Sequence, residues 1–187
     1  MTDRLDVFRA LLRPLPPGCL LDLATGHGAF AMAASDLGWT VTGVDVRTGR
    51  FPADRDDITW IRSDIRHYRF DPADFDVITV LGLLYHLPLT DQMDLLRRCV
   101  GAATIVDTHI SNQPVLRQGG YDGHLFDEDA GRGEAARQRS GTASWNNRWS
   151  FWATLESTER MLHDAGFGHT FRLSPPLAED RIWWWCL

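Results

Sequence analysis

The stretch that decides the fold is Leu20-Leu21-Asp22-Leu23-Ala24-Thr25-Gly26-His27-Gly28-Ala29-Phe30. An apolar run that ends in an acid is typical of a buried strand, and the small residues after it predict a tight turn before the apolar start of a helix. Gly26 and Gly28 lack a Cβ, so the backbone can turn tightly there and approach a ligand closely. The free N–H groups of a helix that begins near Gly28 would point at that ligand. By itself, this strand–turn–helix unit would suit a dinucleotide equally well.

A second unit follows at residues 40–45, Thr40-Val41-Thr42-Gly43-Val44-Asp45. It is a short apolar strand that ends in a carboxylate. An acid at the tip of the second strand of an α/β sheet can accept hydrogen bonds from the hydroxyl groups of a ribose. We therefore expect a ligand that contains a ribose.

Strands and helices alternate along the chain, which predicts a parallel sheet covered by helices on both faces. Such sheets bind ligands outside the carboxyl ends of their strands. A helix should begin near Thr154 and stop at Gly166, and two strands should follow it. Apolar runs predict strands at 18–24, 40–45, 58–62, 76–82, 103–108, 169–173 and 181–187, and helical spacing predicts earlier helices at 3–12, 28–37 and 90–100.

Residues 110–150 break this pattern, because glycines interrupt them and no helical or strand period is visible. A loop this long inside a compact domain is usually functional or disordered. Near its end, Trp149 and Trp152 stand three residues apart, a spacing that predicts packing of a helix entrance against the core. We expect a single domain over residues 1–187, in which residues 110–150 are an inserted loop or lid.

The composition is that of an ordinary globular chain of 187 residues, 44% hydrophobic and 24% charged. A net charge of −6 argues against a dominant electrostatic contact with nucleic acid. Cys19, Cys99 and Cys186 show neither metal spacing nor a disulfide framework, which suits a reducing cytoplasm. No stretch reads as a signal peptide or is long enough to span a bilayer. We expect a cytoplasmic protein without a membrane partner, and its oligomeric state stays open.

The first two units resemble those of the class I S-adenosylmethionine-dependent methyltransferases. Asp22, Gly26 and Gly28 match the acid and the alternating glycines of the family's first loop. Asp45 matches the family's ribose-binding acid. Ala24 stands where the family usually has its first glycine, a departure that alanine tolerates if its φ is negative.

Two further motifs extend the resemblance over roughly the first two thirds of the chain. Ser63-Asp64-Ile65 matches the adenine-recognition acid, and residues 76–87 match the fourth strand with its following loop. The resemblance implies a Rossmann-like, mostly parallel seven-stranded sheet with an antiparallel last strand, and S-adenosylmethionine as cofactor. It also implies which residues bind that cofactor: Asp22, Ala24, Gly26, Gly28, Asp45, Val46, Asp64, Ile65 and Leu81.

The same resemblance puts the methyl acceptor beside the loop after the fourth strand. His86 lies in that loop and His109 follows the fifth strand, so each is a candidate catalytic base that takes a proton from a hydroxyl or amine nucleophile. The spacing of these histidines and Asp107 does not establish a metal site, and none is predicted. The residues expected to bind the acceptor are Tyr85, Tyr121, Trp145 and Arg148.

The leading hypothesis is transfer of a methyl group from S-adenosylmethionine to an oxygen or nitrogen of a small molecule, in secondary metabolism. Residues 84–87 and 150–154 are also similar to stretches of the tRNA wobble-uridine carboxymethyl-transferring enzymes, so a tRNA-modifying methyltransferase is an alternative. A non-catalytic S-adenosylmethionine-binding protein is another. A nicotinamide-dependent dehydrogenase is disfavoured, because Ala24 and the Asp64 motif fit it poorly.

Overall fold

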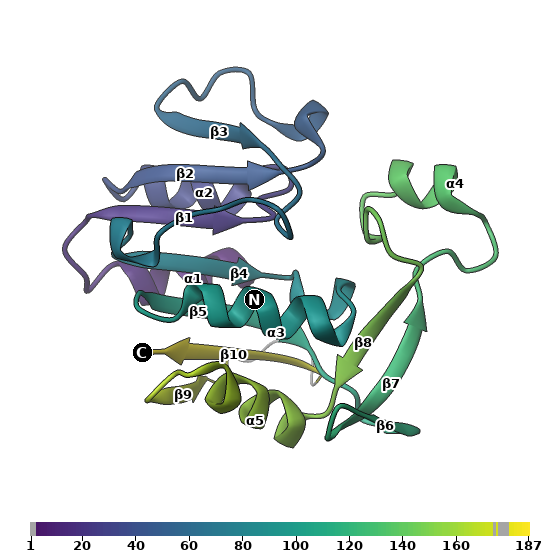
Figure 1. Cartoon of the computed structure of the whole chain (residues 1–187). Coiled ribbons are helices and arrows are strands. Elements are labelled where there is room, and N and C mark those ends of the chain that lie inside the picture. Colours follow the sequence, from purple (N-terminus) through teal and green to yellow (C-terminus); the bar gives the residue numbers. More distant parts are fainter. Residues whose placement is uncertain (1–2, 174, 176–179) are drawn as a thin grey trace.

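The computed structural model describes residues 3–173, 175 and 180–187. Over these residues the chain forms a seven-stranded sheet and a smaller three-stranded antiparallel sheet (Figure 1). No helix among them is both long and apolar enough to cross a membrane. The large sheet has the spatial order β3 (Ile58–Arg62), β2 (Thr40–Asp45), β1 (Cys19–Leu23), β4 (Val77–Leu81), β5 (Ala103–His109), β10 (Arg181–Cys186) and β9 (Thr170–Leu173).

The directions of the strands confirm the predicted fold class. β3, β2, β1, β4 and β5 pair in parallel, and β10 is antiparallel to both of its neighbours, β5 and β9. The chain therefore enters the sheet at β1, builds outward to β3, and then returns to place β4 on the other side of β1. This reversal between β1 and β4 creates the position at which sheets of this class bind ligands.

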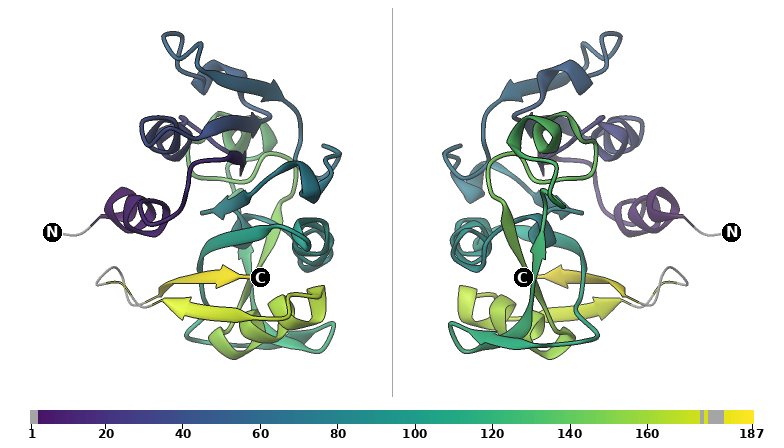
Figure 2. Two further views of the ribbon diagram at one scale, coloured as in Figure 1. Left: turned by 90° about the vertical axis from the view of Figure 1, so that its left-hand side faces the viewer. Right: turned by 90° about the vertical axis from the view of Figure 1, so that its right-hand side faces the viewer.

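Helices cover both faces of the large sheet, and each face has its own apolar core. α1 (Arg4–Leu12) and α2 (Ala29–Ser35) lie on one face, and α3 (Leu89–Cys99) and α5 (Leu155–Ala165) lie on the other (Figure 2). Strand β10 contributes to both cores, because Trp183 and Trp184 are fully buried on opposite faces. Successive side chains of a strand alternate in direction, so the adjacent tryptophans fill both layers.

Local signals in the sequence correctly marked the ends of two helices. Asp3 caps α1, and its Oδ1 accepts the backbone N–H of Asp6 at 2.8 Å. The Thr154 hydroxyl oxygen caps α5 by accepting the backbone N–H of Ser157 at 3.2 Å. Gly166 ends α5 with a φ of 119°, in the left-handed region that favours glycine.

Residues 110–150 differ from the expected loop. They contain β6 (Leu116–Gln118), β7 (Tyr121–Asp127), α4 (Glu134–Arg139) and the start of β8 (Trp149–Ala153), and β6, β7 and β8 form the small sheet. Figure 1 shows β7, β8 and α4 on the side toward which the parallel strands point. Trp149 and Trp152 therefore belong to a strand and not to a helix entrance.

The glycines of this segment were wrongly interpreted as signs of a loop. Gly123 suggested a loop, but it lies inside β7, where a Cβ would meet the backbone oxygen of Trp152 at 2.2 Å. The glycine lets β8 approach β7 closely. β6 is only three residues long and pairs with β7 across a short turn, whereas β8, the partner on the other side, begins more than twenty residues after β7 ends. The sequence therefore shows no local period over enough residues to predict the sheet.

The turn after β1 carries backbone strain at Ala24. Its φ is +59°, so the negative φ at which alanine would be tolerated without strain is not present. The turn is held against β2, since Thr25 N–H donates to the Val44 oxygen at 3.0 Å and Gly26 N–H donates to Asp45 Oδ2 at 2.9 Å. A left-handed conformation costs an L-residue about 1–2 kcal/mol.

Ala24→Gly is expected to raise the free energy of unfolding by about 0.5–1 kcal/mol, because relief of strain exceeds the added entropy of the unfolded chain. Urea denaturation measures the change. Ala31→Gly is the matched control, since Ala31 is fully buried in α2 and the same substitution there should destabilise by about 1 kcal/mol or more. A loss of stability in Ala24→Gly equal to that in the control would contradict the assigned strain.

Candidate active site

A cavity of about 380 Å³ opens at the carboxyl ends of β1, β2 and β4. This is the edge at which the strand order reverses, as the sequence predicted. All but one of the predicted cofactor residues line it, and Tyr85, His86 and Trp145 join them. The lining residues among the sequence-based candidates are Asp22, Ala24, Gly26, Asp45, Val46, Asp64, Ile65, Leu81, Tyr85, His86 and Trp145.

Asp45 ends β2 and is almost fully buried. Its Oδ2 accepts the N–H of Gly26 at 2.9 Å, and its Oδ1 accepts the N–H of Arg47 at 2.7 Å. Each carboxylate oxygen can accept a second hydrogen bond. The side chain therefore fixes the turn after β1 and keeps acceptor capacity for the hydroxyl groups of a ligand.

Asp22 lies deeper in the same wall. Its oxygens accept the hydroxyls of Thr25 at 2.6 Å and Thr79 at 2.7 Å. Burial raises the pKa of Asp22 to about 6, against the lowering effect of the two hydroxyl hydrogen bonds. A cation bound beside this carboxylate would favour its ionised form.

Asp64 follows β3 and forms an ion pair with Arg66, whose Nε donates to Asp64 Oδ1 at 2.9 Å. Burial alone would raise the pKa of Asp64, but hydrogen bonds from the side chain and backbone of Arg66 outweigh it and lower the pKa. The carboxylate is therefore held ionised at the cavity wall. Ile65 lies next to it, buried against the core.

Gly28 is the predicted cofactor residue that does not line the cavity. It precedes α2 with a φ of +74°, and its N–H donates to the Thr25 oxygen at 2.9 Å. A Cβ at this position would meet the Trp60 ring at 2.6 Å. The glycine is required by the turn and by the tryptophan that packs on it.

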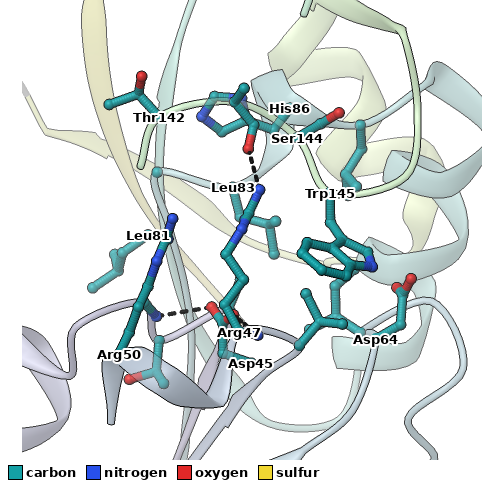
Figure 3. A pocket seen from close by; sticks show the side chains of 18 of the residues that line it. Asp45, Arg47, Arg50, Asp64, Leu81, Leu83, His86, Thr142, Ser144 and Trp145 are labelled. Atoms are coloured by element: carbon teal, nitrogen blue, oxygen red, sulfur yellow. Dashed lines mark hydrogen bonds between the residues drawn. The ribbon is translucent and has the colours of Figure 1, made fainter. Parts of the chain in front are cut away.

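Residues 141–147 line the cavity opposite the strand ends, and together with residues 138–140 they are here called the roof. Two arginines that follow Asp45 hold the roof by its backbone. Arg47 donates to the oxygens of Gln138 at 3.1 Å and Ala143 at 2.9 Å, and Arg50 donates to the oxygen of Ser140 at 2.9 Å. Figure 3 shows the side chains of Arg47 and Arg50 extending from the Asp45 side of the cavity toward the roof. Sequence reasoning had singled out only Trp145 from this segment.

Trp145 is the aromatic side chain of the roof. The Arg47 guanidinium stacks over its ring, 5.1 Å from the centroid. Figure 3 shows the indole on the Asp64 side of Arg47. Trp145 therefore lies beside the acids of β2 and β3, and its expected contact with the acceptor remains untested.

His86 lies in a short 3-10 turn after β4 and lines the cavity. Its Nδ1 lies 3.0 Å from Oε1 of Glu128, a side chain from the segment after β7 that is only 1% exposed. The His86 backbone oxygen also accepts the side-chain N–H of Asn147 in the roof at 3.1 Å. Sequence reasoning missed Glu128, because nothing in the chain near it indicates contact with residue 86.

His109, the other candidate base, has both ring nitrogens engaged. Nδ1 lies 2.9 Å from the carboxylate of Asp180, and Nε2 contacts the guanidinium of Arg181. Because the carboxylate only accepts and the guanidinium only donates, the imidazole carries its proton on Nδ1 and its lone pair on Nε2 faces Arg181. Burial and the positive charge of Arg181 lower the pKa of His109, against the effect of Asp180. The ring acts as a brace and has no free lone pair for a substrate.

Asp107, at the end of β5, is fully buried between two arginines. It accepts hydrogen bonds from Arg4 Nε at 2.7 Å and from Arg181 at 2.9 Å and 3.0 Å. The carboxylate joins α1 to β10. Arg4 also lines the cavity, a contact that the sequence did not predict.

Two residues predicted to bind the acceptor lie outside the cavity lining. The Tyr121 hydroxyl donates to Asp164 at 2.7 Å, because β7 packs against α5. The Arg148 guanidinium is exposed and pairs with Asp127 at 3.2 Å. Both expectations assumed a loop over the cavity, and the strands β7 and β8 direct these side chains elsewhere.

Residues 20–103 match a family model described as a methyltransferase domain. This match covers somewhat less than half of the chain and makes this part similar to a methyltransferase domain. The matched part of the chain runs from β1 to the start of β5 and includes the acids at the strand ends. His109, Glu128 and the roof lie beyond it.

Solved structures resemble this chain along its length. The N-terminal domain of EvdMO1 with SAH bound is 18% identical, with a TM-score of 0.73, over 100% of this chain and 80% of that one. The glycopeptide N-methyltransferase MtfA, complexed with S-adenosylmethionine, is 17% identical with a TM-score of 0.64, over 100% and 94%. The 1,6-didemethyltoxoflavin-N1-methyltransferase of Burkholderia thailandensis is 16% identical with a TM-score of 0.66, over 97% and 76%. These identities establish a shared fold. No curated protein matches the sequence significantly.

Arg47→Ala is expected to loosen the roof without unfolding the protein. The loss of two charge-assisted hydrogen bonds should speed amide exchange in residues 138–147 by about ten- to a hundredfold. Hydrogen–deuterium exchange with mass spectrometry measures this rate. Arg13→Ala, at an exposed position after α1, is the control and should leave the roof unchanged. Equal exchange in both variants would mean that Arg47 does not hold the roof.

Proposed function

We propose that this protein is a methyltransferase that transfers a methyl group from S-adenosylmethionine to an oxygen or nitrogen of a small molecule. The observation that carries the proposal is the convergence of three acids, Asp22, Asp45 and Asp64, with His86 on one cavity of about 380 Å³. This volume falls within the roughly 300–1,000 Å³ usual for small-ligand sites.

The charges along the cavity wall fit the parts of the methyl donor. Asp45 keeps free acceptor capacity for the ribose hydroxyls, and the ionised Asp64 can accept the exocyclic amine of adenine. At the other end, Asp22 and Arg4 present one negative and one positive charge to the methionine portion, which is itself a zwitterion. We assign these residues to holding the donor.

The donor, when bound, supplies a methyl group that its sulfonium already makes electrophilic. The protein therefore has to position the acceptor and exclude water. A base is required only where the acceptor arrives as a neutral hydroxyl or as a protonated amine. We assign that role to His86, because its Nε2 forms no hydrogen bond within the described part of the chain, whereas both nitrogens of His109 are engaged.

Aromatic side chains extend from the cavity away from the donor acids. Tyr85 lines the cavity and packs edge-on against Trp152, with ring centroids 5.4 Å apart. Trp152 stacks in turn on Phe126, whose side chain is partly exposed. This surface supports an acceptor with an apolar or planar body. The net charge of −6 favours such a molecule over tRNA. We place the reaction in secondary metabolism, the setting that the toxoflavin and glycopeptide methyltransferases suggest.

Calorimetry with S-adenosylmethionine tests the donor assignment. We expect the affinity to fall about tenfold from pH 7 to pH 5, because Asp22, with a pKa of about 6, becomes protonated there and can no longer pair with the donor's ammonium group. Asp22→Asn should bind weakly and with little dependence on pH over this range. Tighter binding of a nicotinamide dinucleotide than of S-adenosylmethionine would overturn the proposed function.

Release of S-adenosylhomocysteine, screened over a panel of phenolic, hydroxylated and amine compounds, tests methyl transfer. With a turned-over acceptor, His86→Gln should lower kcat by about 10²–10⁴-fold, as expected for loss of a base. His109→Gln should stay within about tenfold of the parent, because that imidazole has no free lone pair. A larger loss in the His109 variant than in the His86 variant would reverse the assignment. Donor binding without turnover of any acceptor would favour a non-catalytic binding protein.

A further inference from the structure

Glu128 is a buried carboxylate that the donor site does not use. It follows β7, and its side chain is 1% exposed. Its Oε1 lies 3.0 Å from His86 Nδ1 and accepts the Ser150 hydroxyl at 2.8 Å, and its Oε2 accepts the Ser144 N–H at 3.0 Å. Within the described residues, no arginine or lysine side chain is hydrogen-bonded to it. A buried carboxylate in this setting is stabilised chiefly by its hydrogen-bond donors and by any charge on the histidine.

The contact with Glu128 determines which nitrogen of His86 carries the proton. An ionised carboxylate can only accept hydrogen bonds, so Nδ1 of the neutral imidazole must donate. The lone pair is then on Nε2, the nitrogen without a hydrogen-bond partner in the described part of the chain. When Nε2 takes a proton, the new positive charge forms beside the carboxylate, which stabilises it.

We propose that Glu128 is the positioning residue that makes His86 a base. It holds the imidazole in the Nδ1–H tautomer and so keeps Nε2 unprotonated at the cavity. The proposal rests on the proposed function for its role in turnover, but the tautomer itself can be observed without donor or acceptor. It concerns a residue outside the part of the chain that matches the methyltransferase domain.

The same carboxylate couples this base to the roof. Ser144, whose N–H binds Oε2, belongs to the roof, as does Asn147, whose side chain donates to the His86 backbone oxygen at 3.1 Å. The Ser144 hydroxyl in turn donates to the Asn147 oxygen. His86 is therefore held at its ring by Glu128 and at its backbone by Asn147. The contacts of Glu128 with Ser144 and of His86 with Asn147 both require the roof to lie over the cavity.

Two-dimensional ¹⁵N NMR of histidine-labelled full-length protein at about pH 8, where a free imidazole is neutral, tests the proposal. The His86 signals are assigned by their loss in His86→Gln. In the parent protein, the ¹⁵N shifts of His86 should report the Nδ1–H tautomer. In Glu128→Gln, the new amide can donate to Nδ1, and the shifts should reverse to the Nε2–H tautomer.

Two control variants separate positioning from general disruption. Ser150→Ala removes a neutral donor to the same oxygen and should leave the His86 tautomer unchanged. Glu128→Asp keeps a carboxylate and should retain the Nδ1–H form, so it serves if Glu128→Gln fails to fold. An Nε2–H tautomer in the parent protein, or an unchanged one in a folded Glu128→Gln, would overturn the proposal.

Kinetics provide the second readout. Glu128→Gln should lower kcat by about 10²-fold or more while KM for S-adenosylmethionine changes by less than about threefold. Combining it with His86→Gln should add little further loss, because the two residues act as a unit. Multiplicative losses in the double variant would contradict the coupling. Failure of the proposed function would appear separately, as absence of donor binding in calorimetry, with the tautomer of the parent protein intact.

Discussion

The two hydrogen bonds that the Asp45 carboxylate accepts from Gly26 and Arg47 set the shape of the cavity. The first hydrogen bond holds the turn after β1 against the end of β2. In this turn the backbone of Ala24 is left-handed, which costs free energy. The second fixes the residue whose guanidinium reaches across to the roof. One carboxylate thus positions the floor of the cavity directly and its roof through Arg47. A ligand that hydrogen-bonds to Asp45 would contact the point at which both are joined.

Two buried carboxylates near the cavity, Asp107 and Glu128, differ in whether their hydrogen-bond partners can also accept a proton. Asp107 is bound by Arg4 and Arg181, whose guanidinium groups can only donate hydrogen bonds, so this cluster can only hold α1 and β10 in place. Glu128 is bound by hydroxyl and backbone donors and by His86, whose imidazole can accept a proton at its other nitrogen. Removing one partner of either cluster would leave a buried charge uncompensated. Only the cluster around Glu128 can also respond to a proton taken up at the cavity.

The part of the chain that matches the family model and the residues that follow it contribute different groups to the site. The strand ends of residues 20–103 provide the acids that suit a donor shared by a large family. Glu128, the roof and the aromatic surface around Trp152 come from later residues, where loops and added strands set the individual chemistry of a common fold. The small sheet gives these side chains rigid positions, since β7 and β8 pair over their length and pack against α5.

The sequence was sufficient to predict the order of strands and helices, the start of α5 near Thr154 and the acids at the strand ends. Each of these depends on a short-range period or on chain order. The sequence did not predict the positive φ of Ala24, the strands around Gly123 or the different surroundings of His86 and His109. Both histidines lie at the same edge of the sheet, at the ends of neighbouring strands, and nothing near either one in the chain favoured it as the base. Their surroundings come from segments far along the chain: 42 residues separate His86 from Glu128, and 71 separate His109 from Asp180. Hydrogen bonding and burial between such distant segments leave no local pattern, so only the tertiary structure decided which imidazole keeps a free lone pair.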